Sequence, residues 1–253
     1  MRFIATADTD IGISKKTNQD SVLVKHGMVD GVEVLMAIVC DGMGGLSKGE
    51  VASATVIKRF SRWFDEELPY EIDNLSMSII GAKWALLLKE LNSDIFLYAS
   101  RQGITMGTTF TGILFVDDQY VVAHVGDTRL YRISDGMFQM TEDHTFIARE
   151  LKKGTITPEQ AKTDKRRNLL LQCVGASDKV DPQTIVGRAL QGVYMICSDG
   201  FRHEVMPNEM LGYLNYGALV DKETMHRNGR YLIEVAKQRG EKDNISVLLI
   251  KAD

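Results

Sequence analysis

Apolar and polar positions alternate in short runs over much of the chain, and turn residues separate the runs. Runs of this length, rich in β-branched and aromatic residues, predict β-strands. The predicted strands lie at 1–7, 21–25, 32–40, 108–115, 120–126, 129–133, 137–141, 193–197 and 245–250. The run at 32–40 is apolar almost throughout, which is typical of a strand covered on both faces. The four runs between residues 108 and 141 are separated by DDQ, GDT and SDG, and they predict a meander of antiparallel strands.

Other parts of the chain carry apolar residues at helical spacing. A helix is predicted to begin near Gly49, with apolar positions at Ala52, Val56, Phe60 and Trp63. A long helix or a broken pair is predicted over 73–100, with an apolar stripe at Leu75, Ile79, Ala82 and Leu86. Two further helical segments are predicted at 145–168, with Pro158 as a start signal, and at 222–239. Antiparallel strands in the middle of the chain, with helices before and after them, predict an α+β fold rather than a βαβ repeat.

Composition and charge narrow the class of protein. At 253 residues, with 44% hydrophobic and 25% charged residues and no linker-like segment, the chain is expected to form a single domain over 1–253. The formal net charge of -4 offers no basic surface, so nucleic acid is not an expected partner. Neither a secretory signal nor a run of about 20 apolar residues is found, so no membrane insertion is expected. We expect a cytoplasmic protein whose cysteines, Cys40, Cys173 and Cys197, stay reduced.

Four aspartates precede a glycine, and their positions separate them into two kinds. Asp30 and Asp135 lie between strand-like runs, where a hairpin turn explains them. Asp41 and Asp199 instead end the two most apolar strands. For either one alone, capping of a following helix is an alternative explanation.

Two more aspartates, Asp20 and Asp243, also stand at predicted strand boundaries. Carboxylates from distant parts of the chain repel each other if they lie together, and a divalent cation is the usual solution. An oxygen-rich set of ligands suits Mg²⁺ or Mn²⁺, whereas Zn²⁺ favours His and Cys. The four aspartates therefore predict a site for one of these two ions.

A series of motifs within residues 9–250 resembles that of the type 2C metal-dependent protein serine/threonine phosphatases (the PPM family), and is most similar to bacterial members. In chain order the motifs are TDIGISKKTNQD, VCDGMGG, MGTTFTGILF, VGDTRLYRI, TEDHT, CSDGF and KDNISVLLI. The resemblance implies a four-layer α-β-β-α sandwich, with two antiparallel sheets flanked by helices. It also implies a monomeric enzyme that hydrolyses phosphoserine and phosphothreonine on proteins and opposes a bacterial serine/threonine kinase.

The resemblance further implies two Mn²⁺ or Mg²⁺ ions that activate a bridging water for attack on phosphorus. Asp41 would bridge the two ions, and the Gly42 carbonyl would bind one of them. Asp199 and Asp243 would complete the other ion, and Asp20 would hold the ion bound by Gly42, directly or through its waters. Asp41 and Asp199 are thus the expected catalytic residues.

This sequence departs from the family pattern at three places. Lys15 stands where the family commonly has a phosphate-binding arginine, and lysine lacks the bidentate fork. Met43 stands where some members have a histidine assigned as general acid, so no acid is named. Asp127 matches a ligand for a third, weaker metal, but His203 replaces the acid that usually completes that site. Histidine is a poor ligand for Mg²⁺ and an acceptable one for Mn²⁺, and a plain turn role for Asp127 stays open.

Residues 145–168 correspond to the family's flap beside the active site. Its basic residues either meet an acidic or phosphorylated substrate or form a solvated face. They are Lys152, Lys153, Lys162, Lys165, Arg166 and Arg167. His124 and His144 are expected to have structural roles.

Two other functions remain open from the sequence. Residues 45–49 read G-x-S-x-G, the pattern of a serine hydrolase that would use Ser47 as nucleophile. The preceding strand ends several residues too early for that tight turn, and the antiparallel middle lacks alternating β and α units. A catalytically weak or inactive phosphoprotein-binding regulator of the same fold is the second alternative, which the changes at Lys15 and His203 keep open.

Overall fold

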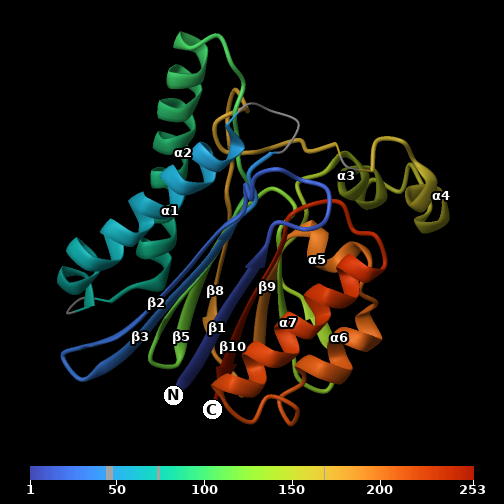
Figure 1. The fold of residues 1–253 in the computed structure, drawn as a ribbon. Coiled ribbons are helices and arrows are strands. Elements are labelled where there is room, and N and C mark those ends of the chain that lie inside the picture. Colours follow the sequence, from blue (N-terminus) through green and yellow to red (C-terminus); the bar gives the residue numbers. More distant parts are fainter. Residues whose placement is uncertain (44–47, 73–74, 168) are drawn as a thin grey trace.

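Two five-stranded antiparallel sheets form the centre of the computed structural model, which describes residues 1–43, 48–72, 75–167 and 169–253 (Figure 1). The first sheet has the order β1 (Phe3–Asp10), β10 (Ile245–Ala252), β9 (Gly192–Cys197), β6 (Arg129–Ile133), β7 (Met137–Gln139). The second has the order β2 (Ser21–Val29), β3 (Val32–Cys40), β4 (Phe110–Val116), β5 (Gln119–Val125), β8 (Gln183–Arg188).

Helices cover the outer face of each sheet, which gives four layers (Figure 1). On the second sheet lie α1 (Gly49–Glu66) and α2 (Met77–Arg101), joined by the short 3₁₀ helix η1 (Leu68–Tyr70). On the first lie α5 (Asp199–His203), α6 (Pro207–Leu214) and α7 (Lys222–Gln238). Two short helices, α3 (Phe146–Lys152) and α4 (Pro158–Thr163), extend to one side. This arrangement confirms the predicted α+β sandwich.

The apolar run at 32–40 is buried on both faces, as its pattern predicts. Leu35, Ala37 and Val39 pack between the two sheets. The alternate residues Met36 and Ile38 pack on the other face, beneath α1 and α2. Strand β3 is therefore held in a fixed register, and its C-terminal end is positioned by packing on both sides.

Two details of the predicted fold are wrong. The strands between residues 108 and 141 are not one meander, because β4 and β5 belong to the second sheet and β6 and β7 to the first. The GDT sequence is the point at which the chain crosses from one sheet to the other. Helix α2 is unbroken, and its buried stripe includes Ile80 and Trp84, whereas Ile79 and Leu86 are exposed. Strand β8 and helices α5 and α6 were not predicted.

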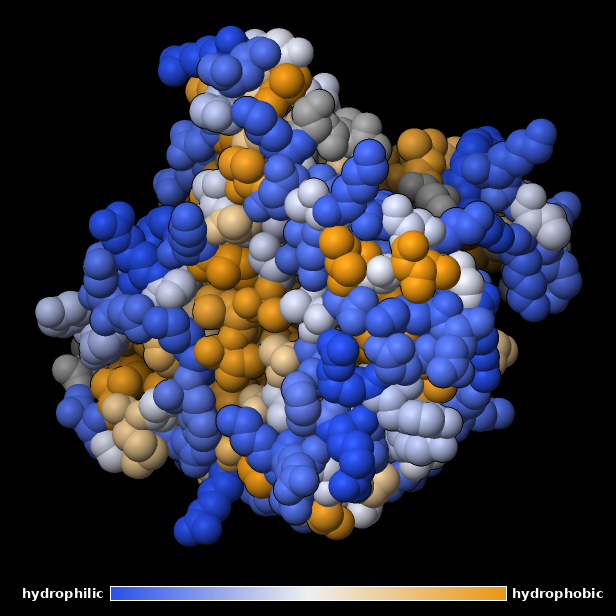
Figure 2. Space-filling view, in the orientation of Figure 1, coloured by the Kyte–Doolittle hydropathy of each residue, from blue (hydrophilic) through white to orange (hydrophobic). Residues whose placement is uncertain are grey.

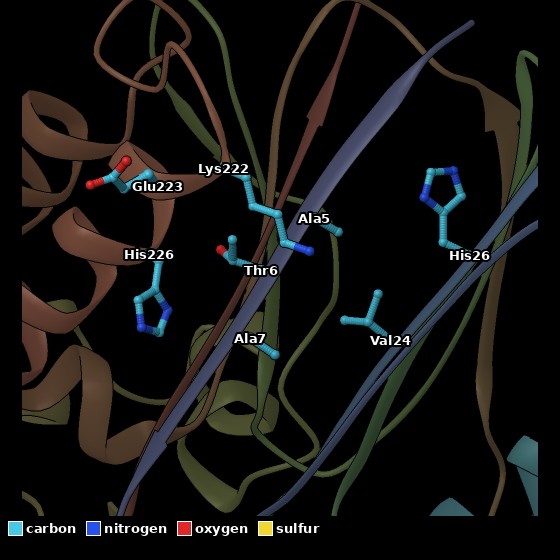
Figure 3. Close-up of a pocket in the computed structure, with 8 residues that line it drawn as sticks. All are labelled: Ala5, Thr6, Ala7, Val24, His26, Lys222, Glu223 and His226. Carbon is cyan, nitrogen blue, oxygen red and sulfur yellow. The ribbon is translucent and has the colours of Figure 1, made fainter.

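A groove follows the free edges of β1 and β2 beside the N-terminus of α7 (Figure 3). It has a volume of about 820 Å³ and is lined by small and apolar residues together with two histidines, Lys222 and Glu223. Figure 2 shows an apolar band on this face of the molecule. None of the aspartates predicted to bind metal lines this groove. Among the helices that the structure describes, none has the length and apolar character needed to cross a membrane.

Candidate metal centre

The pairing of the strands brings four predicted aspartates to one end of the sandwich. Asp41 follows β3 and Asp20 precedes β2, and these strands pair so that Ser21 lies opposite Cys40. Asp199 follows β9 and Asp243 precedes β10, and these strands also pair antiparallel. Since the start of one antiparallel strand lies beside the end of its neighbour, each pair of aspartates shares a sheet end. It is the end away from the two termini (Figure 1).

A hydrogen bond joins the two sheets at this end. The Ser246 hydroxyl donates to Asp20 Oδ2 at 2.6 Å. The other oxygen of this carboxylate, Oδ1, is buried and has no hydrogen-bond partner among the described residues. Burial, together with the charges of Asp199 and Asp243, raises the pKa of Asp20 to about 7. A buried carboxylate oxygen without a partner requires an explanation, and a bound ion is one that fits the charge of this group.

Asp41 is held by its backbone, so that its side chain remains available. Its N–H donates to Thr109 Oγ1 at 2.9 Å, and its carbonyl oxygen accepts from Thr109 N at 2.8 Å and from Thr108 Oγ1 at 2.9 Å. Burial raises the pKa of Asp41 well above its usual range, and the negative charges of Asp20 and Asp199 raise it further. The electrostatics of this site thus favour a bound cation over a free carboxylate.

Gly42 is required by close packing of the backbone. A Cβ atom at this position would lie 2.5 Å from the carbonyl oxygens of both Gln19 and Gly49. Any larger residue would push apart the start of α1 and the segment that carries Asp20. The glycine that follows Asp41 therefore keeps these backbones together.

Asp199 is the first residue of α5, and its Oδ1 atom is likewise buried without a partner among the described residues. Its Oδ2 atom lies 3.7 Å from His203 Nε2. Asp243 is more exposed and forms an ion pair with Lys15, with 2.7 Å between Nζ and Oδ1. The predicted phosphate-binding lysine therefore lies within the carboxylate cluster.

The charge of Lys15 is well stabilised in this position. Burial alone would lower the pKa of Lys15, but its hydrogen bond to Asp243 and the charges of Asp41 and Asp199 outweigh burial and raise the pKa. The ammonium group supplies part of the positive charge that the cluster requires.

The carboxylates suit ions that keep part of their water shell. Among the described residues, no three Asp, Glu, His or Cys side chains are arranged to hold one ion between them. Mg²⁺ is usually bound by only one or two carboxylates and several waters, and an oxygen-only set of this kind also suits Mn²⁺. Two unpartnered buried carboxylate oxygens, on Asp20 and Asp199, fit this mode of binding.

A cavity of about 1000 Å³ opens beside the cluster and includes Lys15, Asp127, Asp199 and Asp243 in its lining. Residues of α3 and α4 form another part of its wall. Of the basic residues at 145–168, Lys162 and Arg167 line the cavity. Three others instead pair with local acids: Lys152 with Glu142, Lys153 with Glu150 and Arg166 with Asp164.

Two arginines in this cavity were missed by the sequence analysis. Arg129 makes a bidentate contact with Asp143, with 2.8 Å from Nε and 2.7 Å from Nη2. Arg202 reaches Asp127 from α5. The signal for Arg202 was its place directly after the DGF motif, because Asp199, Arg202 and His203 of the same short helix all line the cavity.

The two histidines expected to have structural roles lie side by side. His124 is fully buried, its Nδ1 atom is bonded to Thr111 Oγ1 at 2.8 Å, and burial lowers its pKa to about 3. His144 lies against it, with 4.9 Å between ring centroids. The N–H of Met43 donates to the Gly107 carbonyl at 3.0 Å. Ser47, the alternative nucleophile, lies outside the described residues.

Comparisons with known proteins agree with these motifs. A family model described as protein phosphatase 2C matches residues 13–249. The chain is 33% identical over 222 residues to serine/threonine phosphatase stp of Listeria monocytogenes, which covers 86% of this chain and 84% of that protein. It is 32% identical to serine/threonine protein phosphatase PstP of Mycobacterium tuberculosis over 253 residues, which covers 98% of this chain and 44% of PstP.

Solved structures give the same result. A serine/threonine phosphatase of S. agalactiae superposes with a TM-score of 0.86 at 26% identity, and the match covers 100% of both chains. The catalytic domain of PstP in complex with two manganese ions superposes with a TM-score of 0.78 at 29% identity, covering 98% of this chain and 97% of that one. The chain therefore belongs to the protein phosphatase 2C family.

Proposed function

We propose that this protein hydrolyses phosphoserine and phosphothreonine residues of proteins with two Mn²⁺ or Mg²⁺ ions. The observation that carries this proposal is the meeting of four aspartates at one end of the sandwich, with two buried carboxylate oxygens left unpartnered. Relatives named as serine/threonine phosphatases, and a structural neighbour solved with two manganese ions, support it.

The carboxylate cluster would hold both ions. Asp41 would lie between them, with the Gly42 carbonyl as a ligand of one. Asp199 and Asp243 would bind the other ion, and Asp20 would hold the ion bound by Gly42, directly or through water. When bound, the two ions would lower the pKa of a water and neutralise charge on the phosphate.

The residues of the chain itself would bind and orient the phosphate. Lys15 carries its positive charge into the cavity beside Asp199 and Asp243. Because an ammonium is a point charge without the planar fork of arginine, it would attract the phosphate but orient it weakly. Lys162 and Arg167, which line the cavity, would meet acidic or phosphorylated parts of the substrate. Met43 has no proton to give to the leaving alkoxide, and no other residue is assigned to that role.

The test is phosphate release from a phosphothreonine peptide with Mn²⁺, with Mg²⁺ and with excess EDTA. We expect release that needs metal, falls by at least about 100-fold in Asp41→Asn and is retained in Ser47→Ala. Loss of activity in Ser47→Ala with activity kept in EDTA would indicate the serine hydrolase instead. A folded wild type that releases no phosphate with either metal would indicate the phosphoprotein-binding regulator.

We also propose a partner, a location and an oligomeric state for the enzyme. The relatives named for this activity come from bacteria, which supports a role opposite a bacterial serine/threonine kinase. We propose that the chain acts as a cytoplasmic monomer and forms one catalytic domain, with residues 145–168 as a flap over the active site. The position of Lys162 and Arg167 on the cavity wall supports this role for the flap.

A further inference from the structure

Asp127 lines the same cavity as Asp199 and Asp243, two of the proposed metal ligands, and it is in contact with the side chain of Arg202. Arg202 Nη2 lies 3.1 Å from the Asp127 carbonyl oxygen and 3.5 Å from Oδ2. Both side chains are largely buried, with exposed fractions of 15% and 14%. A guanidinium group stays protonated at any pH that a folded protein meets. Asp127 therefore faces a permanent positive charge.

The position of Arg202 is fixed by the packing of α5. Gly200 and Phe201, the residues between Asp199 and Arg202, are buried, and α5 packs against β10 and α7. Arg202 is thus carried on the same short helix as a proposed metal ligand.

Arg202 is not held as a well-satisfied structural ion pair. Its Nε atom is buried and has no acceptor among the described residues. By contrast, Arg129 in the same cavity makes two short bonds to Asp143 and donates from Nη1 to the Tyr131 hydroxyl at 2.9 Å. A buried donor without an acceptor destabilises a fold. Arg202 is therefore better explained by the charge it supplies than by the stability it gives.

Position 203, next to Arg202, also departs from the family pattern, with a histidine in place of an acid. The ring nitrogens of His203 face Asp199 Oδ2 at 3.7 Å and Glu241 Oε2 at 3.4 Å. Among the described residues, His203 forms no ion pair with Asp127. His203 stands at the position of the acid that would share an ion with Asp127, but it faces Asp199 and Glu241 instead.

We propose that Arg202 takes the place of a third divalent ion at Asp127, so that the protein binds two ions and no more. The proposal rests on the two-ion function proposed above. A fixed guanidinium repels a divalent cation that approaches the same carboxylate, and it neutralises part of the negative charge that such an ion would need. An exchangeable ion is replaced by a permanent side-chain charge.

The test is the number of Mn²⁺ ions bound per chain, measured by equilibrium dialysis with elemental analysis of the folded protein. We expect two ions on the wild type and on Arg202→Lys, which keeps a cation near Asp127. The double variant Arg202→Ala/His203→Asp removes the cation and restores an acid, and it is expected to bind three ions under the conditions in which the wild type binds two. Adding Asp127→Asn to that variant should return the number to two.

Each contrary outcome has a separate meaning. Three ions on the wild type, or two on the Arg202→Ala/His203→Asp variant, would overturn the assignment of Arg202 and leave the proposed phosphatase function intact. Fewer than two ions on a wild type that also releases no phosphate would overturn the proposed function and this inference with it.

Discussion

Replacing Asp20 by asparagine should make the metal-free protein more stable while it weakens the metal site. In the folded protein, burial first, and then the charges of Asp199 and Asp243, raise the pKa of Asp20 from 3.8 to about 7. The pKa is raised by about three units, and each unit corresponds to about 1.36 kcal/mol. Keeping this group ionised in the folded protein therefore costs about 4 kcal/mol of stability. Asparagine removes the charge and still offers an oxygen to the Ser246 hydroxyl.

Part of the gain is lost because a buried amide is also poorly solvated. We therefore expect about 2 kcal/mol of added stability for Asp20→Asn in EDTA at pH 7.5. For a chain of this size, this corresponds to a rise in Tm of about 4–8 °C. The measurement is urea and thermal unfolding in EDTA. The matched control is Asp94→Asn, which changes an exposed aspartate on α2 and should shift Tm by less than about 2 °C.

The pH dependence of the gain in stability tests whether the charge of Asp20 is its cause. The folded-state pKa of Asp20 lies above the unfolded value, so the folded protein holds more protons between pH 3.8 and about 7. This group therefore lowers the stability of the metal-free wild type as pH rises through that window. The gain from Asp20→Asn should be small at pH 4.5 and complete above pH 7. No gain in stability at pH 7.5, or an equal gain at both pH values, would show that ionisation of Asp20 does not destabilise the folded protein.

Three other changes have clear expected outcomes. Lys15→Arg should lower the KM for a phosphopeptide about two- to tenfold because arginine binds phosphate bidentately, and a rise in KM would contradict this. Gly42→Ala places a Cβ 2.5 Å from two carbonyl oxygens and should abolish metal-dependent activity, whereas Gly212→Ala, which has open space, should leave activity unchanged in the same assay. Ile80→Ala should lower the free energy of unfolding by about 2–5 kcal/mol and exposed Ile79→Ala by less than about 1 kcal/mol, and equal losses in urea unfolding would contradict the packing of α2.

Much of the site was predictable because its aspartates stand at strand ends. An apolar run that stops at Asp-Gly is a local signal, and it placed Asp41 and Asp199 correctly at the ends of β3 and β9. Antiparallel pairing then brings Asp20 beside Asp41 and Asp243 beside Asp199, and packing of the two sheets brings these pairs to the same end. The motif series added the expected fold, which the two sheets and their helices confirm.

The errors arise where local patterns allow two answers. Helix α2 carries apolar residues on two adjacent lines, one through Ile79 and one through Ile80, so periodicity alone does not choose between them. The choice is made by tertiary packing, since Trp84 lies edge-on to Phe60 and Trp63 of α1 with ring centroids 5.1 and 5.5 Å apart. Packing of this kind between distant segments leaves no local trace in the sequence.

The crossing between sheets was missed for a related reason. The turn that contains Asp127 has the same local sequence whether its strands pair with each other or enter different sheets. Arg202 was missed because arginine is most often an exposed residue. Its contact with Asp127 depends on where α5 lies against β10, which only the folded structure specifies.

The most direct test of the two-ion centre is anomalous diffraction at the manganese edge from crystals grown with Mn²⁺. We expect two peaks about 4 Å apart on either side of the Asp41 carboxylate, one of them beside Asp199 and Asp243 and the other toward Asp20. A single peak, or peaks that lie away from Asp41, would contradict it.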